Sequence, residues 1–192
     1  MDEKIYVTPQ SLLNDSFELG IRIFKSGFRP SFTIGIWRGG TPVGVAVQEM
    51  LDHLGVKTDH IAIRTSSYYG INKRDKRVKV YGLEYVVRYA DWDDDLLIVD
   101  DVFDSGNSIR SVIETLKTKM RRNLPKDIRI ATPWYKPNNN ITDIVPDYYI
   151  HESDQWLVFP HELDGLTRDE IFANKPGLKD IFDKAGLIEK NS

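Results

Sequence analysis

Three carboxylates stand beside a turn that could hold an anion in the segment LLIVDDVFDSGNSI, residues 96–109. The backbone N–H groups of the turn, its two serine hydroxyls and the start of the next helix could together bind a phosphate monoester. Gly106 would let the backbone approach this ligand without a Cβ in the way. The residues of this predicted phosphate-binding loop are Asp104, Ser105, Gly106, Asn107 and Ser108.

The carboxylates of Asp100, Asp101 and Asp104 would repel a phosphate, so they must face something else. Ribose hydroxyls, a cation or a proton to be accepted would each suit them. Mg²⁺ fits Asp100 and Asp101, directly or through water, because this ion keeps several waters and bridges to substrate oxygens. The alternative is that the three acids only cap the start of a helix.

A second candidate anion site lies in WRGGTPVG, residues 37–44. Gly39 and Gly40 offer backbone donors without side-chain obstruction, and Arg38 offers a forked cation for phosphate oxygens. Taken alone, Arg-Gly-Gly is as typical of an ordinary strand-to-helix turn. Its position before a predicted helix makes it a candidate for binding the same ligand.

The elements that position these loops alternate along the chain. Apolar runs predict strands within residues 31–40, 57–65, 95–102 and 127–135. Helical spacing of apolar residues predicts helices within residues 8–27, 41–55 and 106–120. This alternation predicts an α/β fold, with a mostly parallel central sheet and helices on both faces. Ligands in such folds bind beyond the carboxyl ends of the strands, where both loops lie.

Two further segments fall outside this alternation. Residues 66–93 form a long connection rich in Tyr, Lys and Arg, and their alternation predicts a hairpin that stands off the sheet. A long connection inside a compact domain is typical of a lid or binding loop. In the tail, Thr167 and Glu170 form a capping-box pattern that predicts short helices.

Composition excludes several classes of protein. The 192 residues contain no cysteine, which excludes disulfides, thiolate metal sites and cysteine nucleophiles. The net charge of −3 provides no positive field for nucleic acid or an anionic membrane. The sequence begins without a signal-peptide pattern and has no apolar run of membrane-spanning length. We therefore expect a soluble cytoplasmic protein that binds neither nucleic acid nor membrane.

The segment LLIVDDVFDSGNSI closely resembles the 5-phosphoribosyl-1-pyrophosphate signature of type I phosphoribosyltransferases. It departs mildly at Asn107, where the family often has Gly, Thr or Lys. With this signature downstream, WRGG resembles the pyrophosphate loop of the purine enzymes. The resemblance covers roughly residues 30–165 and implies a phosphoribosyltransferase domain over residues 1–165, with a C-terminal helical extension over 166–192.

The segments ATPWYKPNN and DYYIHESDQWLVFPHEL resemble the base-binding side of xanthine-guanine and hypoxanthine phosphoribosyltransferases. The resemblance implies a hood over residues 136–165, in which Lys136 meets the exocyclic oxygen of a 6-oxopurine and Trp156 stacks on the ring. Lysine is a donor only, so it would reject the 6-amino group of adenine. Backbone groups of Leu157 would read the other edge. Outside this context, a core tryptophan and a solvated lysine are the simpler explanations.

The same resemblance implies two further roles. Ser67 and Tyr68 stand where a Ser-Tyr pair opens the mobile catalytic loop of hypoxanthine-type enzymes, here about residues 66–92. Closure of this loop would exclude water from the reaction. Asp104 would be the catalytic residue that accepts or shares the imidazole proton of the purine.

The resulting hypothesis is a purine salvage enzyme that transfers 5-phosphoribosyl from phosphoribosyl pyrophosphate to hypoxanthine, guanine or xanthine, with Mg²⁺ as cofactor. Two alternatives remain: a non-catalytic regulator that senses phosphoribosyl pyrophosphate, and a phosphoribosyltransferase for a pyrimidine. The sequence does not rank the three purines. The apolar tail suggests a homodimer or homotetramer.

Overall fold

The computed structural model of the chain describes residues 4–69 and 76–187. Its elements form two compact units, which we describe separately. The larger unit comprises Leu12–Asp154, and the smaller one comprises Met1–Ser11 together with Gln155–Ser192. Across the described ranges, no helix has the length and apolar character needed to cross a membrane.

The larger unit is built on a seven-stranded sheet with the order β4-β3-β2-β5-β7-β6, and β8 pairs with β7. The strands are β2 (Phe32–Trp37), β3 (Asp59–Tyr69), β4 (Lys76–Tyr81), β5 (Asp95–Val99), β6 (Val102–Phe103), β7 (Asp127–Tyr135) and β8 (Tyr148–Glu152). The pairs in this sheet are parallel except β3 with β4. The carboxyl ends of β2, β5 and β7 therefore meet at one edge, where both predicted anion loops follow their strands.

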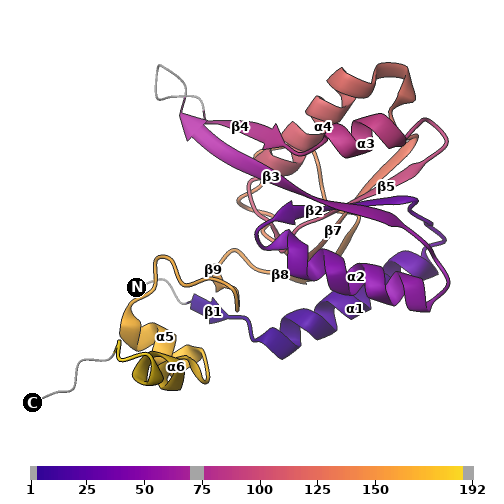
Figure 1. The fold of residues 1–192 in the computed structure, drawn as a ribbon. Coiled ribbons are helices and arrows are strands. Elements are labelled where there is room, and N and C mark those ends of the chain that lie inside the picture. The colour runs from indigo at the N-terminus through magenta and orange to yellow at the C-terminus, as the bar shows by residue number, and fades with distance from the viewer. Residues whose placement is uncertain (1–3, 70–75, 188–192) are drawn as a thin grey trace, which may run out of the picture. The chain divides into compact units, whose positions relative to one another are not determined.

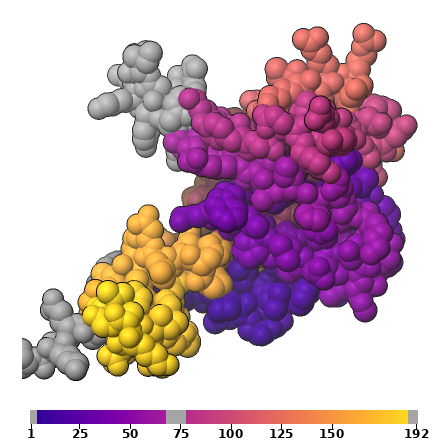
Figure 2. Space-filling model, viewed as in Figure 1, coloured from indigo at the N-terminus to yellow at the C-terminus, as the bar shows by residue number. Residues whose placement is uncertain are grey.

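Helices cover both faces of this sheet, with α1 and α2 on one side and α3 and α4 on the other (Figure 1). Their bounds are α1 (Pro9–Lys25), α2 (Gly40–His53), α3 (Glu84–Tyr89) and α4 (Asn107–Met120), and a short 3₁₀ turn (Arg121–Asn123) follows α4. This arrangement confirms the predicted α/β fold. The space-filling view shows the same face of the molecule (Figure 2).

The core explains why these segments adopt these elements. Strand β5 has the sequence DLLIV, and its last four residues are buried because helices cover both faces of the sheet. On the α4 side, Ile98 and Ile34 pack in one cluster with Val112 and Leu116, which lie one helical turn apart. Full burial of such side chains contributes about 1.5–3 kcal/mol each and fixes the height of α4 over the strand ends.

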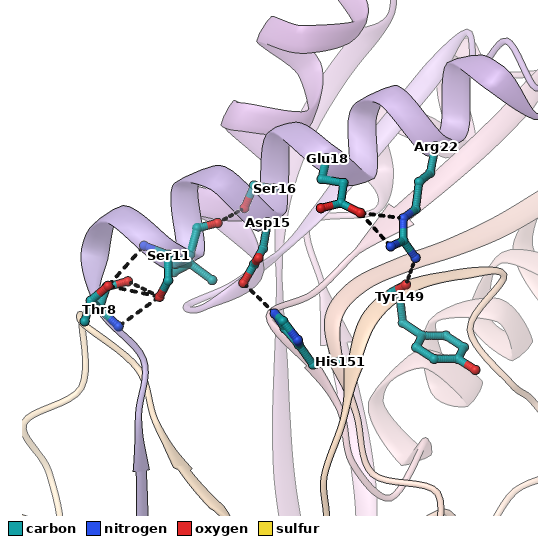
Figure 3. A network of polar contacts seen from close by, with 9 residues as sticks. Thr8, Ser11, Asp15, Ser16, Glu18, Arg22, Tyr149 and His151 are labelled. Carbon is teal, nitrogen blue, oxygen red and sulfur yellow. Dashed lines mark hydrogen bonds and ion pairs between the residues drawn. The ribbon is translucent and has the colours of Figure 1, made fainter.

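Polar contacts fix α1 against the sheet, as Figure 3 shows. Thr8 caps the start of the helix, because its Oγ1 accepts a hydrogen bond from the Ser11 N–H at 3.1 Å. Further along the helix, the Asp15 carboxylate lies 3.0 Å from His151 Nε2 on β8. Arg22 donates to the Tyr149 carbonyl at 2.7 Å. Helix α1 is thereby anchored to strand β8 at two points within the larger unit.

The smaller unit joins the two ends of the chain. Strands β1 (Lys4–Tyr6) and β9 (Trp156–Val158) pair in parallel, and α5 (Arg168–Asn174) and α6 (Leu178–Lys184) follow. The predicted capping box is confirmed, since Thr167 Oγ1 accepts from the Glu170 N–H and the Glu170 side chain accepts from the Thr167 N–H. The tail therefore forms short helices, as predicted.

The long connection agrees with its prediction in one respect and differs in another. The predicted hairpin is present: β2 pairs with β3 only as far as Arg64, whereas β4 pairs with β3 from Arg64 to Tyr69, so the two strands extend together beyond the end of β2. The LEYVV segment, expected to continue the alternation, forms α3 instead. Leu83 and Val86 are buried there at helical spacing, which outweighs the strand propensity of the valines. Residues 70–75 of the predicted loop lie outside the described residues.

Candidate active site

The acidic pair stands at the carboxyl end of the central strand β5. Asp100 continues the strand pairing by donating its backbone N–H to the Ala131 carbonyl at 3.2 Å. Asp101 is buried, with 9% of its surface exposed, and its N–H donates to Asp100 Oδ1 at 3.0 Å. Two carboxylates are thus held side by side on rigid backbone, at the edge of the sheet where α/β folds bind ligands.

This arrangement is electrostatically costly. Burial raises the pKa of Asp100 well above its usual value, and the neighbouring Asp101 charge raises it further. Hydrogen bonds from the backbone N–H groups of Asp101 and Gly40 oppose this shift. A bound cation would remove the repulsion. Within residues 4–69 and 76–187, no cluster of three or more acidic or histidine residues could hold a metal, so a cation would use this pair plus oxygens from ligand or water.

The predicted phosphate loop wraps the start of α4. Gly106 has a φ of 76°, in the left-handed region that favours glycine, and the helix begins at the next residue. A Cβ on Gly106 would lie 2.5 Å from Thr142 Oγ1, so the packing also requires glycine. A pocket of about 200 Å³ is lined by the acidic pair and by the loop, including Ser105 and Ser108. N–H groups at the start of a helix and serine hydroxyls suit a phosphate group there.

The second anion loop packs directly on the acidic pair. A Cβ on Gly39 would lie 1.7 Å from Asp101 Oδ2, and one on Gly40 would lie 2.5 Å from the Val99 carbonyl oxygen. Both glycines are buried, whereas Arg38, which follows a cis peptide bond after Trp37, is exposed. The structure therefore brings together the two motifs that the sequence separates, and it shows why Gly-Gly is needed.

Lys136 and Asp104 face each other at the end of β7. Lys136 is buried, with 9% of its surface exposed, and its Nζ lies 3.8 Å from Asp104 Oδ2. The Lys136 N–H donates to the Phe103 carbonyl at 2.9 Å, which fixes the lysine beside the phosphate loop. A buried ammonium with one carboxylate neighbour can donate to a ligand oxygen while the carboxylate accepts a proton nearby.

Asn139 is a site residue that the sequence reasoning missed. Its Nδ2 donates to Asp104 Oδ1 at 2.9 Å, whereas Lys136 Nζ lies near Asp104 Oδ2. The two side chains therefore contact different oxygens of the same carboxylate. The following backbone also joins the loop, because the Ile141 N–H donates to the Ser105 carbonyl. The available signal was the PNNN turn directly after Lys136, since asparagines in a turn commonly bond to nearby groups.

In the smaller unit, the predicted stacking residue Trp156 is 53% exposed. The backbone of its neighbour Leu157 is directed away from β1. The Val158 carbonyl accepts from the Val7 N–H at 3.0 Å, and peptide groups alternate in direction along a strand. The N–H and C=O of Leu157 therefore point to the edge of β9 that carries no strand among the described residues.

Comparisons with known proteins agree with this geometry. The family model of the phosphoribosyl transferase domain matches residues 15–164. The protein belongs to the phosphoribosyl transferase family. It is 28% identical over 180 residues to a hypoxanthine-guanine phosphoribosyltransferase of Lactococcus lactis, covering 91% of this chain and 88% of the relative.

Solved phosphoribosyltransferase structures share the fold. A purine phosphoribosyltransferase from Pyrococcus horikoshii superposes with a TM-score of 0.69 at 28% identity, over 86% of this chain and 98% of that one. The xanthine-guanine-hypoxanthine enzyme of Helicobacter pylori, at 20% identity, gives a TM-score of 0.65 over 84% of this chain and 96% of its own. The resemblance inferred from the sequence motifs is therefore confirmed at the level of family and fold.

The placement of the predicted residues in this phosphoribosyltransferase is uneven. The larger unit brings the Arg-Gly-Gly loop, the acidic pair, the phosphate loop and Lys136 to one edge of its sheet. Ser67 and Tyr68 lie at the end of β3, opposite Val78 and Arg77 of β4, and their role at the mobile loop stays a prediction. Trp156 and Leu157 belong to the smaller unit. Their role with the purine stays a prediction.

Proposed function

We propose that the protein transfers the 5-phosphoribosyl group of phosphoribosyl pyrophosphate to a ring nitrogen of a 6-oxopurine, releasing pyrophosphate, in purine salvage. The observation that carries this proposal is the packing of Gly39 and Gly40 on Asp100 and Asp101, beside the phosphate loop. It gives one place for a phosphate, a ribose and a diphosphate in series. The names of the relatives support purines as acceptors.

We propose that each loop holds one part of phosphoribosyl pyrophosphate. The turn at residues 104–108 and the start of α4 bind the 5′-phosphate through N–H groups and serine hydroxyls. The Asp100 and Asp101 carboxylates face the ribose hydroxyls. Gly39 and Gly40 donate backbone N–H groups to the pyrophosphate, and exposed Arg38 neutralises it.

The acidic pair has a catalytic reason in this scheme. Displacement at the anomeric carbon develops positive charge on the ribose ring, as in other glycosyl transfers, and two nearby carboxylates stabilise that charge. The same carboxylates suit Mg²⁺, directly or through water, because the pair is costly without a cation. When bound, the ion supplies positive charge that stabilises the departing pyrophosphate.

For the purine, we propose Lys136 as the donor to the 6-oxo group and Asp104 as the acceptor of the imidazole proton. The 3.8 Å between Lys136 Nζ and Asp104 Oδ2 supports these paired roles. Trp156 offers an exposed ring for stacking, worth on the order of 1–3 kcal/mol per base. Leu157 offers a donor and an acceptor on the edge of β9 that pairs with no other strand of residues 4–69 and 76–187.

The test is a product assay with phosphoribosyl pyrophosphate, Mg²⁺ and one base at a time: hypoxanthine, guanine, xanthine, adenine, uracil or orotate. We expect nucleotide from at least one 6-oxopurine. Asp104→Asn should lower turnover on the order of 10²-fold while phosphate binding persists. Lys136→Ala should reduce activity selectively with 6-oxopurines. No product with any base, or product with a pyrimidine alone, would refute the proposal.

We also propose that the enzyme assembles as a homodimer or homotetramer. Large apolar side chains are exposed on both units, among them Trp37 and Val45 on the larger and Ile181 on the smaller, at 57%, 57% and 59%. Exposed apolar side chains of this size can be buried between subunits. Light scattering coupled to size exclusion measures the state directly, and a monomer at micromolar concentration would contradict the proposal.

A further inference from the structure

An ammonium group covers one face of the Trp156 ring. Lys4 Nζ lies 5.2 Å from the ring centroid, within the range of a cation–π interaction. The contact follows from strand register, because Lys4 of β1 and Trp156 of β9 are direct partners in the parallel pair. Partner residues project their side chains from the same face of a sheet. The N-terminal strand therefore places a cation on the ring.

Glu170 of the C-terminal tail holds that cation in place. Its Oε1 accepts from Lys4 Nζ at 2.5 Å and from the Tyr6 hydroxyl at 3.3 Å. Its Oε2 accepts from the Thr167 N–H at 2.8 Å and from the Thr167 hydroxyl at 3.0 Å. One carboxylate oxygen thus serves the capping box of α5 and the other serves the lysine. This gives the helical tail a role beyond packing.

The ion pair stays charged over the working range of an enzyme. The Lys4 ammonium, together with hydrogen bonds from Thr167, lowers the pKa of Glu170 to about 2. The hydrogen bond to Glu170 raises the pKa of Lys4 in turn. Both side chains are partly covered, at 23% and 30% exposure, so solvent screens the pair only in part.

The contact restrains an aromatic ring that is otherwise exposed. Trp156 keeps 53% of its surface accessible although the Lys4 ammonium lies over its ring. Gly165 borders the ring, because a Cβ there would lie 3.9 Å from Trp156 Cζ2. Ordering a free side chain on binding costs conformational entropy, and a ring that is already held avoids much of this cost.

We propose that Lys4 and Glu170 are positioning residues for purine binding, which hold the exposed Trp156 ring so that a base stacks on it. This inference rests on the proposed function. It predicts that the first strand and the tail helix set the affinity for the purine and leave the chemical step unchanged. If the Lys4–Glu170 contact only stabilised the fold, its loss would lower stability and would change kcat and the KM of both substrates together.

The test compares Lys4→Met, Lys4→Arg and Glu170→Gln with Lys179→Met, which removes an exposed lysine of α6 and serves as the charge-matched control. We expect Lys4→Met to raise the purine KM about 3- to 10-fold with kcat and the phosphoribosyl pyrophosphate KM unchanged. Lys4→Arg should restore the purine KM, because it retains the cation. Glu170→Gln should give an intermediate value, and the control should match the parent.

A double variant sharpens the outcome. In a Trp156→Leu background, Lys4→Met should have no further effect on the purine KM, since the ring that it positions is absent. If Lys4→Met unfolds at the assay temperature, Lys4→Arg and Glu170→Gln carry the comparison. An unchanged purine KM in Lys4→Met or in Glu170→Gln overturns this inference alone. A parent enzyme that makes no nucleotide with any base overturns the proposed function instead, and this role with it.

Discussion

The contact between the Arg-Gly-Gly loop and the acidic pair can be tested by single glycine-to-alanine substitutions, each of which adds one Cβ atom. Gly39 has a φ of −68° and a ψ of −32°, so alanine suits its backbone and only steric contacts oppose the change. The new Cβ would lie 1.7 Å from Asp101 Oδ2 and 2.2 Å from its Cγ. The carboxylate must therefore leave its position, which a side chain can do.

Gly40→Ala meets a different obstacle. Its Cβ would lie 2.5 Å from the Val99 carbonyl oxygen and 2.8 Å from the Asp100 Cα, and both atoms belong to the backbone that ends β5. Neither can move without distorting the central strand. Overpacking of this kind costs about 1–3 kcal/mol, so we expect a lower Tm by roughly 2–4 °C per kcal/mol for a protein of this size.

The two variants should separate stability from activity. Gly39→Ala should keep nearly the parental Tm but lose on the order of 10²-fold in kcat, because a displacement of about 1 Å at a reacting centre has that effect. Gly40→Ala should lose both stability and turnover. Gly44→Ala is the matched control on the same helix, since its Cβ would meet its nearest atom at 3.7 Å, an ordinary contact.

The assays are thermal unfolding and steady-state nucleotide formation over a range of Mg²⁺ concentrations. Gly44→Ala should retain activity and gain up to about 1 kcal/mol, as expected for glycine replaced by alanine inside a helix. We also expect Gly39→Ala to need more Mg²⁺ for half-maximal rate, because the displaced Asp101 is one of the two proposed ligands. A Gly39→Ala enzyme with parental kcat and Mg²⁺ dependence would refute the assignment of Asp101.

Three further predictions follow from the polar groups. Asp100→Asn should raise the Tm at pH 8 while lowering turnover. Burial beside Asp101 raises the pKa of Asp100, so the folded state loses stability as pH rises through that value. An equal Tm at pH 8 would contradict this. Glu170→Gln should be less stable than the parent above about pH 4.5, and the difference should vanish as pH falls toward 2. The reason is that the folded-state pKa of Glu170 is depressed from 4.5 to about 2. Measuring the Tm of both proteins against pH tests this pH range. Asn139→Ala should lower kcat about 3- to 10-fold, because it removes the hydrogen bond that holds Asp104. Asn138→Ala should leave kcat unchanged, because the Asn138 side chain bonds Asp154 instead. Equal effects of the two variants would indicate a general loosening of the loop.

Most of the fold could be predicted because its signals are local. The buried run DLLIV, the helical spacing of Ile109, Val112 and Leu116, and the capping box at Thr167 each specify an element within a short window. The connection over residues 66–93 could not be predicted in the same way. Strand propensity in LEYVV competes there with burial of Leu83 and Val86, and tertiary packing decides the outcome.

The candidate site divides along a similar line. Residues with a strong chemical signature, such as the acidic pair and Gly106, could be found from the sequence because type and spacing suffice. Asn139 and Lys4 could not, because each acts through a partner far away in the chain: Asp104 for Asn139, and Trp156 and Glu170 for Lys4. Nothing in a short window marks an asparagine or a lysine that positions another residue.

The topology explains why the chemically active loops of the larger unit share one edge although their sequences are far apart. Because β2, β5 and β7 are neighbours in a parallel sheet, their carboxyl ends must meet, and the loops after them must compete for the same space. Side chains at residues 39 and 40 would occupy the volume that Asp101 and the end of β5 already fill. Glycine at both positions leaves room for the Asp101 carboxylate and for the end of β5. The two motifs are therefore one structural unit, and a substitution in either should be read by its effect on the other.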